Sequence, residues 1–155
     1  MREFNSIEEL RPLIGEEVAV SDWVTIDQER INRFADATGD HQWIHVDAEK
    51  SASGPFGTTV AHGFLTLSLL PLLTQQAIVV HSTRMGVNYG LNRVRFPAPV
   101  PVNSRLRGRF RLLQIEDLEP VMGLPGAQFV WEVTIERDGS AKPVCVAESV
   151  SRRYG

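Results

Sequence analysis

The sequence predicts an α+β fold in which an antiparallel sheet wraps around one long apolar helix. Residues 63–80 (GFLTLSLLPLLTQQAIVV) form a nearly continuous apolar stretch of helical length, and the second half of the chain reads as strands. A helix that is apolar almost all round must be covered on most of its surface. For a chain of 155 residues, a twisted sheet is the simplest cover, and the chain has the size of a single domain over residues 1–155.

Two helices are predicted before the apolar one. Segments 6–9 (Ser-Ile-Glu-Glu) and 25–28 (Thr-Ile-Asp-Gln) both show the capping-box pattern, in which the first hydroxyl and the last carboxylate or amide satisfy free N–H groups. The first should open a short helix that ends near Gly15. The second should open a helix over 27–38 that stops at Gly39, followed by a loop.

The apolar stretch needs a choice between a membrane span and a buried helix. Its length approaches that of a span, but polar residues and one proline interrupt it: Thr66, Ser68, Pro71, Thr74, Gln75 and Gln76. This composition favours a helix buried at the centre of the fold, with a possible kink at Pro71 because proline lacks an N–H group.

Strands are predicted by β-branched and aromatic residues between Pro, Gly and Asn. The segments are 17–24, Arg84–Phe96, Ser104–Leu118, Ala127–Arg137 and Lys142–Arg153.

Residues 105–112 alternate clearly, with Leu106, Phe110 and Leu112 on one face and four arginines on the other. The Asp138-Gly139 pair predicts a hairpin. Five or so antiparallel strands around one apolar helix are typical of the hot-dog fold. In that fold a second copy usually completes one sheet face, so we predict a homodimer.

Composition excludes several function classes. The net charge is −3 without a basic run, which argues against a nucleic-acid partner. Cys145 is the only cysteine, so one chain has neither a disulfide nor a cysteine-based zinc site. No Gly-rich dinucleotide turn and no His-Glu metal helix is present, so we expect no metal, flavin or nicotinamide. The charged N-terminus (MREFNSIEELRP) predicts no secretory signal, and the protein is expected in the cytoplasm.

The segment from Phe34 to Asp47 (FADATGDHQWIHVD) is the most informative in the chain. Its Gly39-Asp40 pair, followed by four residues and then His45, resembles the signature of the MaoC-like hydratase family, and within it the NodN-like branch. The resemblance continues through 61–64 (Ala-His-Gly-Phe) and 93–97 (Arg-Val-Arg-Phe-Pro), and therefore covers most of the chain.

This resemblance implies an (R)-specific enoyl-CoA hydratase that adds water to a trans-2-enoyl-CoA. Asp40 and His45 are implied to hold the water and pass its protons, and the backbone N–H of Gly63 to polarise the thioester carbonyl. The chemistry fits: a carboxylate and an imidazole have pKa values of about 3.9 and about 6.5, so one can accept a proton while the other donates one. Gly63 lies where the apolar helix should begin, and free N–H groups occur at a helix start.

Each residue also has a structural interpretation. Asp40 after Gly39 is a common turn residue, and a lone His45 is often a satisfied structural histidine. Four further candidates for substrate binding are Trp43, His62, Arg93 and Arg95. For His62 the alternative is a loop-positioning role. The two arginines could contact the phosphates of coenzyme A, and the alternative is that they lie on a solvated strand face.

Two other functions remain open. Thioesterases and carrier-protein dehydratases of the hot-dog fold usually carry a carboxylate on the central helix, whereas 63–80 contains no Asp or Glu. The second open function is that of a non-catalytic family member, which binds acyl thioesters or serves as a partner subunit. The chain also departs from the family pattern, because Gln42-Trp43 stands where many members have Asn-Pro. A helix hydroxyl that supports Asp40 is left unassigned between Thr66 and Ser68.

Overall fold

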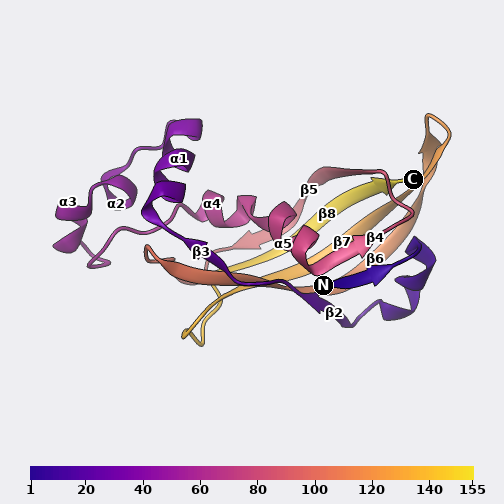
Figure 1. Ribbon diagram of the computed structural model, residues 1–155, viewed down its shortest axis with the longest axis horizontal. Helices are drawn as coiled ribbons and strands as arrows, with labels where there is room; N and C mark the ends of the chain where they lie inside the picture. Colours follow the sequence, from indigo (N-terminus) through magenta and orange to yellow (C-terminus); the bar gives the residue numbers. More distant parts are fainter.

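The computed structural model describes all 155 residues, as an antiparallel sheet with helices packed on its inner face (Figure 1). The main sheet has six strands in the order β2-β6-β7-β8-β5, and β3 also pairs with β6. A separate parallel pair joins β1 to β4. The strands are β1 (Arg2–Phe4), β2 (Glu17–Val20), β3 (Val24–Ile26), β4 (Ile78–Val80), β5 (Met85–Arg95), β6 (Ser104–Val121), β7 (Leu124–Arg137) and β8 (Cys145–Tyr154).

The apolar stretch forms two helices rather than one. Helix α4 (Gly63–Ser68) ends before Leu69, and α5 (Leu70–Ala77) follows with Pro71 in its first turn. Proline has no N–H with which to continue the hydrogen-bond ladder of α4, and it is well accommodated at the start of a new helix. The predicted interruption at Pro71 is therefore confirmed, whereas the predicted single helix over 63–80 is wrong.

The last residues of that stretch form strand β4, which pairs with β1. Residues 78–80 are Ile-Val-Val, and β-branched side chains favour the extended backbone. No helix in the structure is long and apolar enough to cross a membrane.

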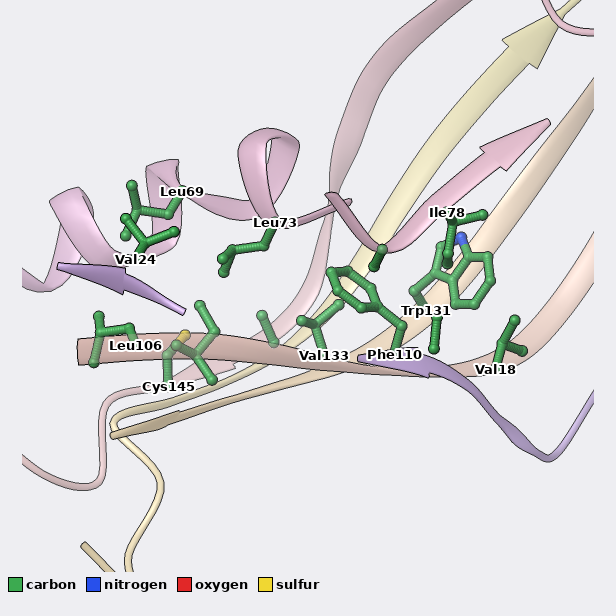
Figure 2. Close-up of a cluster of buried hydrophobic side chains, with 14 of the residues drawn as sticks. Val18, Val24, Leu69, Leu73, Ile78, Leu106, Phe110, Trp131, Val133 and Cys145 are labelled. Carbon is green, nitrogen blue, oxygen red and sulfur yellow. The ribbon is translucent and has the colours of Figure 1, made fainter. Parts of the chain in front are cut away.

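The core lies between α4–α5 and the sheet, as Figure 2 shows. One helical face is completely covered, and it carries Leu65, Leu69, Leu73 and Ala77 at a spacing of four residues. The sheet side supplies Leu106, Phe110, Leu112, Phe129 and Val133, all 1% exposed or less.

The predicted alternation in β6 is confirmed. The arginines at 105, 107, 109 and 111 face outward, where they pair with Glu17, Glu132, Glu136 and Asp138. Strands β6 and β7 are longer than predicted and meet at a tight turn, in which Met122 and Gly123 have φ angles of 52° and 77°. Prolines at 120 and 125 interrupt the apolar pattern near this turn, which is why the sequence predicted the end of β6 three residues too early and the start of β7 three residues too late.

The N-terminal helices need correction. Segment 6–13 forms two short 3-10 helices, η1 (Ile7–Glu9) and η2 (Arg11–Leu13), and the Ser6 side chain caps neither. Helix α1 (Gln28–Thr38) is capped by Asp27, whose carboxylate accepts a hydrogen bond from the N–H of Arg30 at 2.9 Å. Thr25 lies instead in β3, so the predicted cap was wrong by two residues.

The segment after α1 was predicted to be a loop but contains helical turns. Gly39 ends α1 with a φ angle of 82°, as predicted. Helices α2 (Trp43–Val46) and α3 (Ala48–Ala52) then follow. Their four and five residues are too few to show helical periodicity in the sequence. In Figure 1, α1, α2 and α3 lie together beyond the end of the sheet, near the start of α4.

Candidate active site

The structure brings the side chains of Asp40, His45 and His62 together. Their ligand-type nitrogen and oxygen atoms all lie within 4.8 Å of one another. Asp40 follows the left-handed end of α1, and His45 lies in the single turn of α2. The N–H of Gln42 donates to the carboxylate of Asp40 at 3.3 Å, which fixes the start of this turn. The expected convergence of Asp40 and His45 is thus present in the structure.

His45 is buried and has a defined hydrogen-bonding direction. Its Nδ1 lies 2.6 Å from the carbonyl oxygen of Val60. A carbonyl oxygen can only accept, so Nδ1 carries the hydrogen in the neutral ring and Nε2 is left as an acceptor. Burial lowers the pKa of His45, and repulsion from His62 lowers this pKa further, against opposing effects of Val60 and Asp40. His45 is therefore neutral at pH 7 and suited to accept a proton.

Asp40 faces the solvent more than its partners do. Its side chain is 51% exposed, whereas that of His62 is 3% exposed. A solvated carboxylate next to a buried neutral imidazole gives the site two hydrogen-bond acceptors in different environments. Together, Asp40 and His45 Nε2 can accept both hydrogens of one water molecule.

His62 connects the catalytic candidates. Its Nε2 lies 2.9 Å from the backbone oxygen of Asp40, and its ring stacks on that of His45 with centroids 3.8 Å apart. Phe34 covers another side of the ring at 4.9 Å. The buried Nδ1 of His62 has no partner. These contacts correspond to the loop-positioning alternative rather than to direct contact with substrate.

The same three residues offer the ligand types of a zinc site. One nitrogen of each ring already bonds to a carbonyl oxygen, and the two rings are stacked at 22° to each other. Stacked rings place their in-plane lone pairs side by side, which does not suit a tetrahedral ion. The geometry therefore fits an acid/base site better than a metal centre.

A mostly apolar cavity of about 300 Å³ opens beside His45. Gly63 and Thr66 line it from α4. The rest of its lining comes from Ile44, Phe56, Val60, Ala61, Phe96, Pro97, Ala98, Pro99, Val100 and Val144. A proton acceptor at the wall of an apolar cavity is the setting in which a short acyl chain can meet a bound water.

Gly63 is the first residue of α4, so its N–H has no acceptor within the helix. A Cβ atom at this position would lie 3.2 Å from the ring of Phe96, tighter than an ordinary contact. Glycine therefore lets Phe96 pack against the start of α4, at a residue that lines the cavity and whose N–H makes no backbone hydrogen bond.

Of the two helix hydroxyls left open by the sequence, the structure brings Thr66 to the site. Thr66 is 1% exposed and lines the cavity with His45. Ser68 is exposed, and its hydroxyl donates to the backbone oxygen of Phe64 at 2.6 Å. The spacing from Gly63 could have identified Thr66, because residues three apart share a helix face.

Three other candidates lie outside this cavity. Trp43 is half-buried against Gly54, with the ammonium of Lys50 4.7 Å from its ring centroid. Arg93 and Arg95 pair in register with Glu148 and Val146 of β8. These two positions face away from α4, because Cys145 and Ala147 are the core-facing residues of that part of β8. This placement corresponds to the alternative of a solvated strand face. Arg93 and Arg95 line a separate surface pocket, and Pro97 lines both that pocket and the His45 cavity.

Solved structures with the same fold were found by structural comparison. A monoamine oxidase regulatory protein from Archaeoglobus fulgius has a TM-score of 0.71 at 21% identity, covering 99% of this chain and 96% of the other. An unliganded R-hydratase from Pseudomonas aeruginosa has a TM-score of 0.64 at 20% identity, covering 89% and 79%. These neighbours confirm the predicted hot-dog fold.

Sequence comparison gives closer relatives. The chain is 57% identical to a 3-hydroxyacyl-thioester dehydratase Z of Mycobacterium tuberculosis over 152 residues, 98% of each protein. It is 43% identical to nodulation protein N of Rhizobium leguminosarum bv. viciae over 148 residues, 94% of this chain and 89% of that protein. A family model described as a MaoC like domain matches residues 9–122. The chain therefore belongs to the MaoC-like family, and the resemblance to its NodN-like branch is confirmed.

Proposed function

We propose that this protein is an (R)-specific enoyl-CoA hydratase, which adds water to trans-2-enoyl-CoA to give (R)-3-hydroxyacyl-CoA. The observation that carries the proposal is the neutral, buried His45 within 4.8 Å of Asp40, at the wall of a cavity that Gly63 also lines. The 57% identity to a 3-hydroxyacyl-thioester dehydratase supports the same chemistry in the reverse direction.

In the first step, Asp40 and His45 Nε2 accept the two hydrogens of one water molecule. Its lone pairs then face the cavity, where C3 of the enoyl group lies. As the new C3–O bond forms, one water proton passes to the Asp40/His45 pair, and the π electrons of the double bond move toward the thioester oxygen. The pair then returns a proton to C2, which restores the thioester carbonyl and the resting state of the site.

The negative charge that develops on the thioester oxygen needs a donor. The free N–H of Gly63 supplies it from the cavity wall, and such donors act most strongly on charge that appears only in the transition state. His62 fixes the position of the Gly63 N–H relative to Asp40, because it directly precedes Gly63 and its ring bonds to the backbone oxygen of Asp40.

The pH dependence of hydration should show His45 in its neutral form. Because the pKa of His45 is lowered from 6.5, kcat/KM should rise with pH through an apparent pKa below 6.5 and be flat around neutrality. A pH series with crotonyl-CoA on the purified protein measures this. An acid limb centred above 6.5 would contradict the neutral-base assignment.

Hydration of crotonyl-CoA should give the (R)-3-hydroxy product. Asp40 and His45 share one water, so the hydroxyl and the proton should reach the same face of the alkene, while Gly63 selects that face by holding the carbonyl. The product is tested with dehydrogenases specific for each isomer. Coupling only to the (R)-specific enzyme is expected, and complete coupling to the (S)-specific enzyme would show the assignment to be wrong.

Two other functions make different predictions for the same assay. A hot-dog thioesterase or carrier-protein dehydratase with a helix carboxylate is disfavoured, because α4 and α5 contain no acidic residue. A non-catalytic partner subunit would bind crotonyl-CoA without turnover. Loss of the absorbance of the conjugated enoyl thioester, with no free thiol released, distinguishes hydration from thioester hydrolysis and from binding without turnover.

We also propose that the protein is a homodimer that pairs through β5. This strand is the sheet edge, and 10 of its 11 residues are exposed. It carries Met85, Val87, Tyr89 and Leu91, which are between 42% and 60% exposed. A long apolar edge strand with free backbone groups is a surface that natural proteins normally cover.

Leu91→Lys should therefore convert the dimer to a monomer at micromolar concentration, because it places a charge in the middle of the proposed contact. Sedimentation velocity measures the change. Ile14→Lys is the matched control, since Ile14 is similarly exposed at 44% but lies away from β5 in the N-terminal segment. Equal sedimentation of wild type and Leu91→Lys would remove β5 from the interface.

A further inference from the structure

The side-chain amide of Gln28 makes three hydrogen bonds, none of which belongs to a helix cap. Gln28 is the first residue of α1, and Asp27 caps this helix. The Nε2 of Gln28 donates to the backbone oxygen of His45 at 2.7 Å and to Oδ1 of Asn32 at 2.9 Å. Its Oε1 accepts from the hydroxyl of Thr59 at 2.6 Å. Both hydrogens of the amide nitrogen are therefore used, and the amide oxygen has a donor.

Two of these bonds reach the two segments that hold the His45 ring. Thr59 is 2% exposed and precedes Val60, whose carbonyl oxygen lies 2.6 Å from Nδ1 of His45. The N–H of Val60 also donates to the backbone oxygen of Ile44 at 3.0 Å. Gln28 adds a connection from α1, because it bonds to the backbone of His45 on one side and to Thr59 on the other. This bridge sets the distance between the imidazole and the carbonyl oxygen that accepts from it.

That distance matters because the bond to Val60 decides which ring nitrogen of His45 carries the hydrogen. With the hydrogen on Nδ1, Nε2 is left as an acceptor. If the carbonyl oxygen moves away, nothing favours this tautomer, and part of the protein carries the hydrogen on Nε2. In that form Nε2 cannot accept a proton from water.

The bridge lies behind the site rather than in it. Neither Gln28 nor Thr59 lines the cavity beside His45. Their side chains can therefore act on the reaction only through the position of His45, and not by contact with substrate.

We propose that Gln28 is a positioning residue for His45, which acts with the Thr59 hydroxyl to hold the imidazole in the tautomer that leaves Nε2 as an acceptor. The effect on rate rests on the proposed hydration. The tautomer itself is a property of the free protein, so it can be measured without turnover.

The tautomer is measured by nitrogen NMR on the full chain labelled in histidine, at neutral pH and without substrate. His45→Ala identifies the signals of His45. We expect a single Nδ1–H tautomer in the wild type and a mixture of tautomers in Gln28→Leu, which removes the amide and retains a good helix former. Thr59→Val removes the hydroxyl at similar volume and should give the same mixture. Thr59→Ser retains the hydroxyl and should keep the wild-type signal.

The same variants should separate kcat from KM in crotonyl-CoA hydration. Gln28→Leu and Thr59→Val should each lower kcat by about tenfold to a hundredfold, the cost of a misplaced catalytic group. KM should stay within about twofold, because neither residue lines the cavity. The double variant should lose little more than either single variant, since both substitutions break the same bridge. Thr59→Ser should restore most of the activity lost in Thr59→Val.

Glu29→Leu is the matched control for a change in the first turn of α1. Glu29 follows Gln28, is exposed and pairs with Arg33 in the same helix. Its substitution should change neither the His45 signals nor kcat. Thermal unfolding midpoints show that each variant is folded. If Gln28→Leu fails to fold, the comparison of Thr59→Val with Thr59→Ser carries the test.

Three results would overturn the proposal. An unchanged His45 tautomer in Gln28→Leu and Thr59→Val would remove the bridge as its cause. Equal loss in Thr59→Ser and Thr59→Val would assign the effect to packing rather than to the hydroxyl. Losses that multiply in the double variant would show that the two residues act separately. Binding of crotonyl-CoA to the wild type without turnover would instead contradict the proposed hydration, and the NMR comparison would still decide the role of Gln28.

Discussion

Asp40→Asn and His45→Ala should each reduce crotonyl-CoA hydration by about 10² to 10⁴ in kcat, because the first removes the carboxylate base and the second removes the imidazole of the acid/base pair. The double variant should be little worse than either single variant, since both residues act on the same water molecule. Initial rates on purified variants, compared with their thermal unfolding midpoints, measure the effect and show that the fold is retained.

His41→Ala provides the control for this pair. His41 lies in the same segment but is exposed and paired with Asp36 at 2.8 Å, away from the His45 cavity. Its removal should leave kcat within about twofold, as for a solvated side chain outside the site. Near-normal turnover in Asp40→Asn or His45→Ala would show that the residue concerned does not act on the water.

Gly63→Pro should reduce kcat by about 10² to 10³, the range found when one donor to a developing oxyanion is lost. Proline is tolerated at the first position of a helix, where the missing N–H has no helical acceptor. The residue before it, His62, already has φ −60° and ψ 140°, which suits a residue that precedes proline. The substitution therefore removes the N–H while it conserves the helix start.

The matched control is Gly63→Ala, which retains the N–H but introduces the same Cβ contact with Phe96 at 3.2 Å. It should lose far less activity than Gly63→Pro. If the two variants were equally impaired, crowding of Phe96 rather than the lost donor would explain the effect, and the oxyanion role of Gly63 would be wrong.

The strands could be predicted well because their signal is local. Alternation with a period of two places Leu106, Phe110 and Leu112 on one face whatever the rest of the fold does. The ends of the helices were predicted less well, because they depend on competition between alternative cap residues and between helix formation and strand pairing. Asp27 outcompetes Thr25 as the cap of α1, and pairing with β1 converts 78–80 from helix to strand.

The candidate site shows the same division. The motif predicted that Asp40 and His45 converge, and the spacing placed Gly63 at a helix start, since both features are encoded within short segments. The contact of His62 with the backbone of Asp40 joins residues 22 apart, and no local pattern indicates it. The orientation of Arg93 depended on the register of β5 with β8, which shifts twice along the strand.

The break at Leu69 has a consequence for how the protein opens. Helices of six and eight residues are too short to be stable by themselves in water. Both are held by one row of side chains, Leu65, Leu69, Leu73 and Ala77, against the sheet. Their backbone amides should therefore exchange with solvent in a single cooperative event, in which the helical layer leaves the sheet. The N–H groups of Thr66 in α4 and Leu73 in α5, which donate to the carbonyl oxygens of His62 and Leu69, should then show the same protection factor, although they belong to different helices.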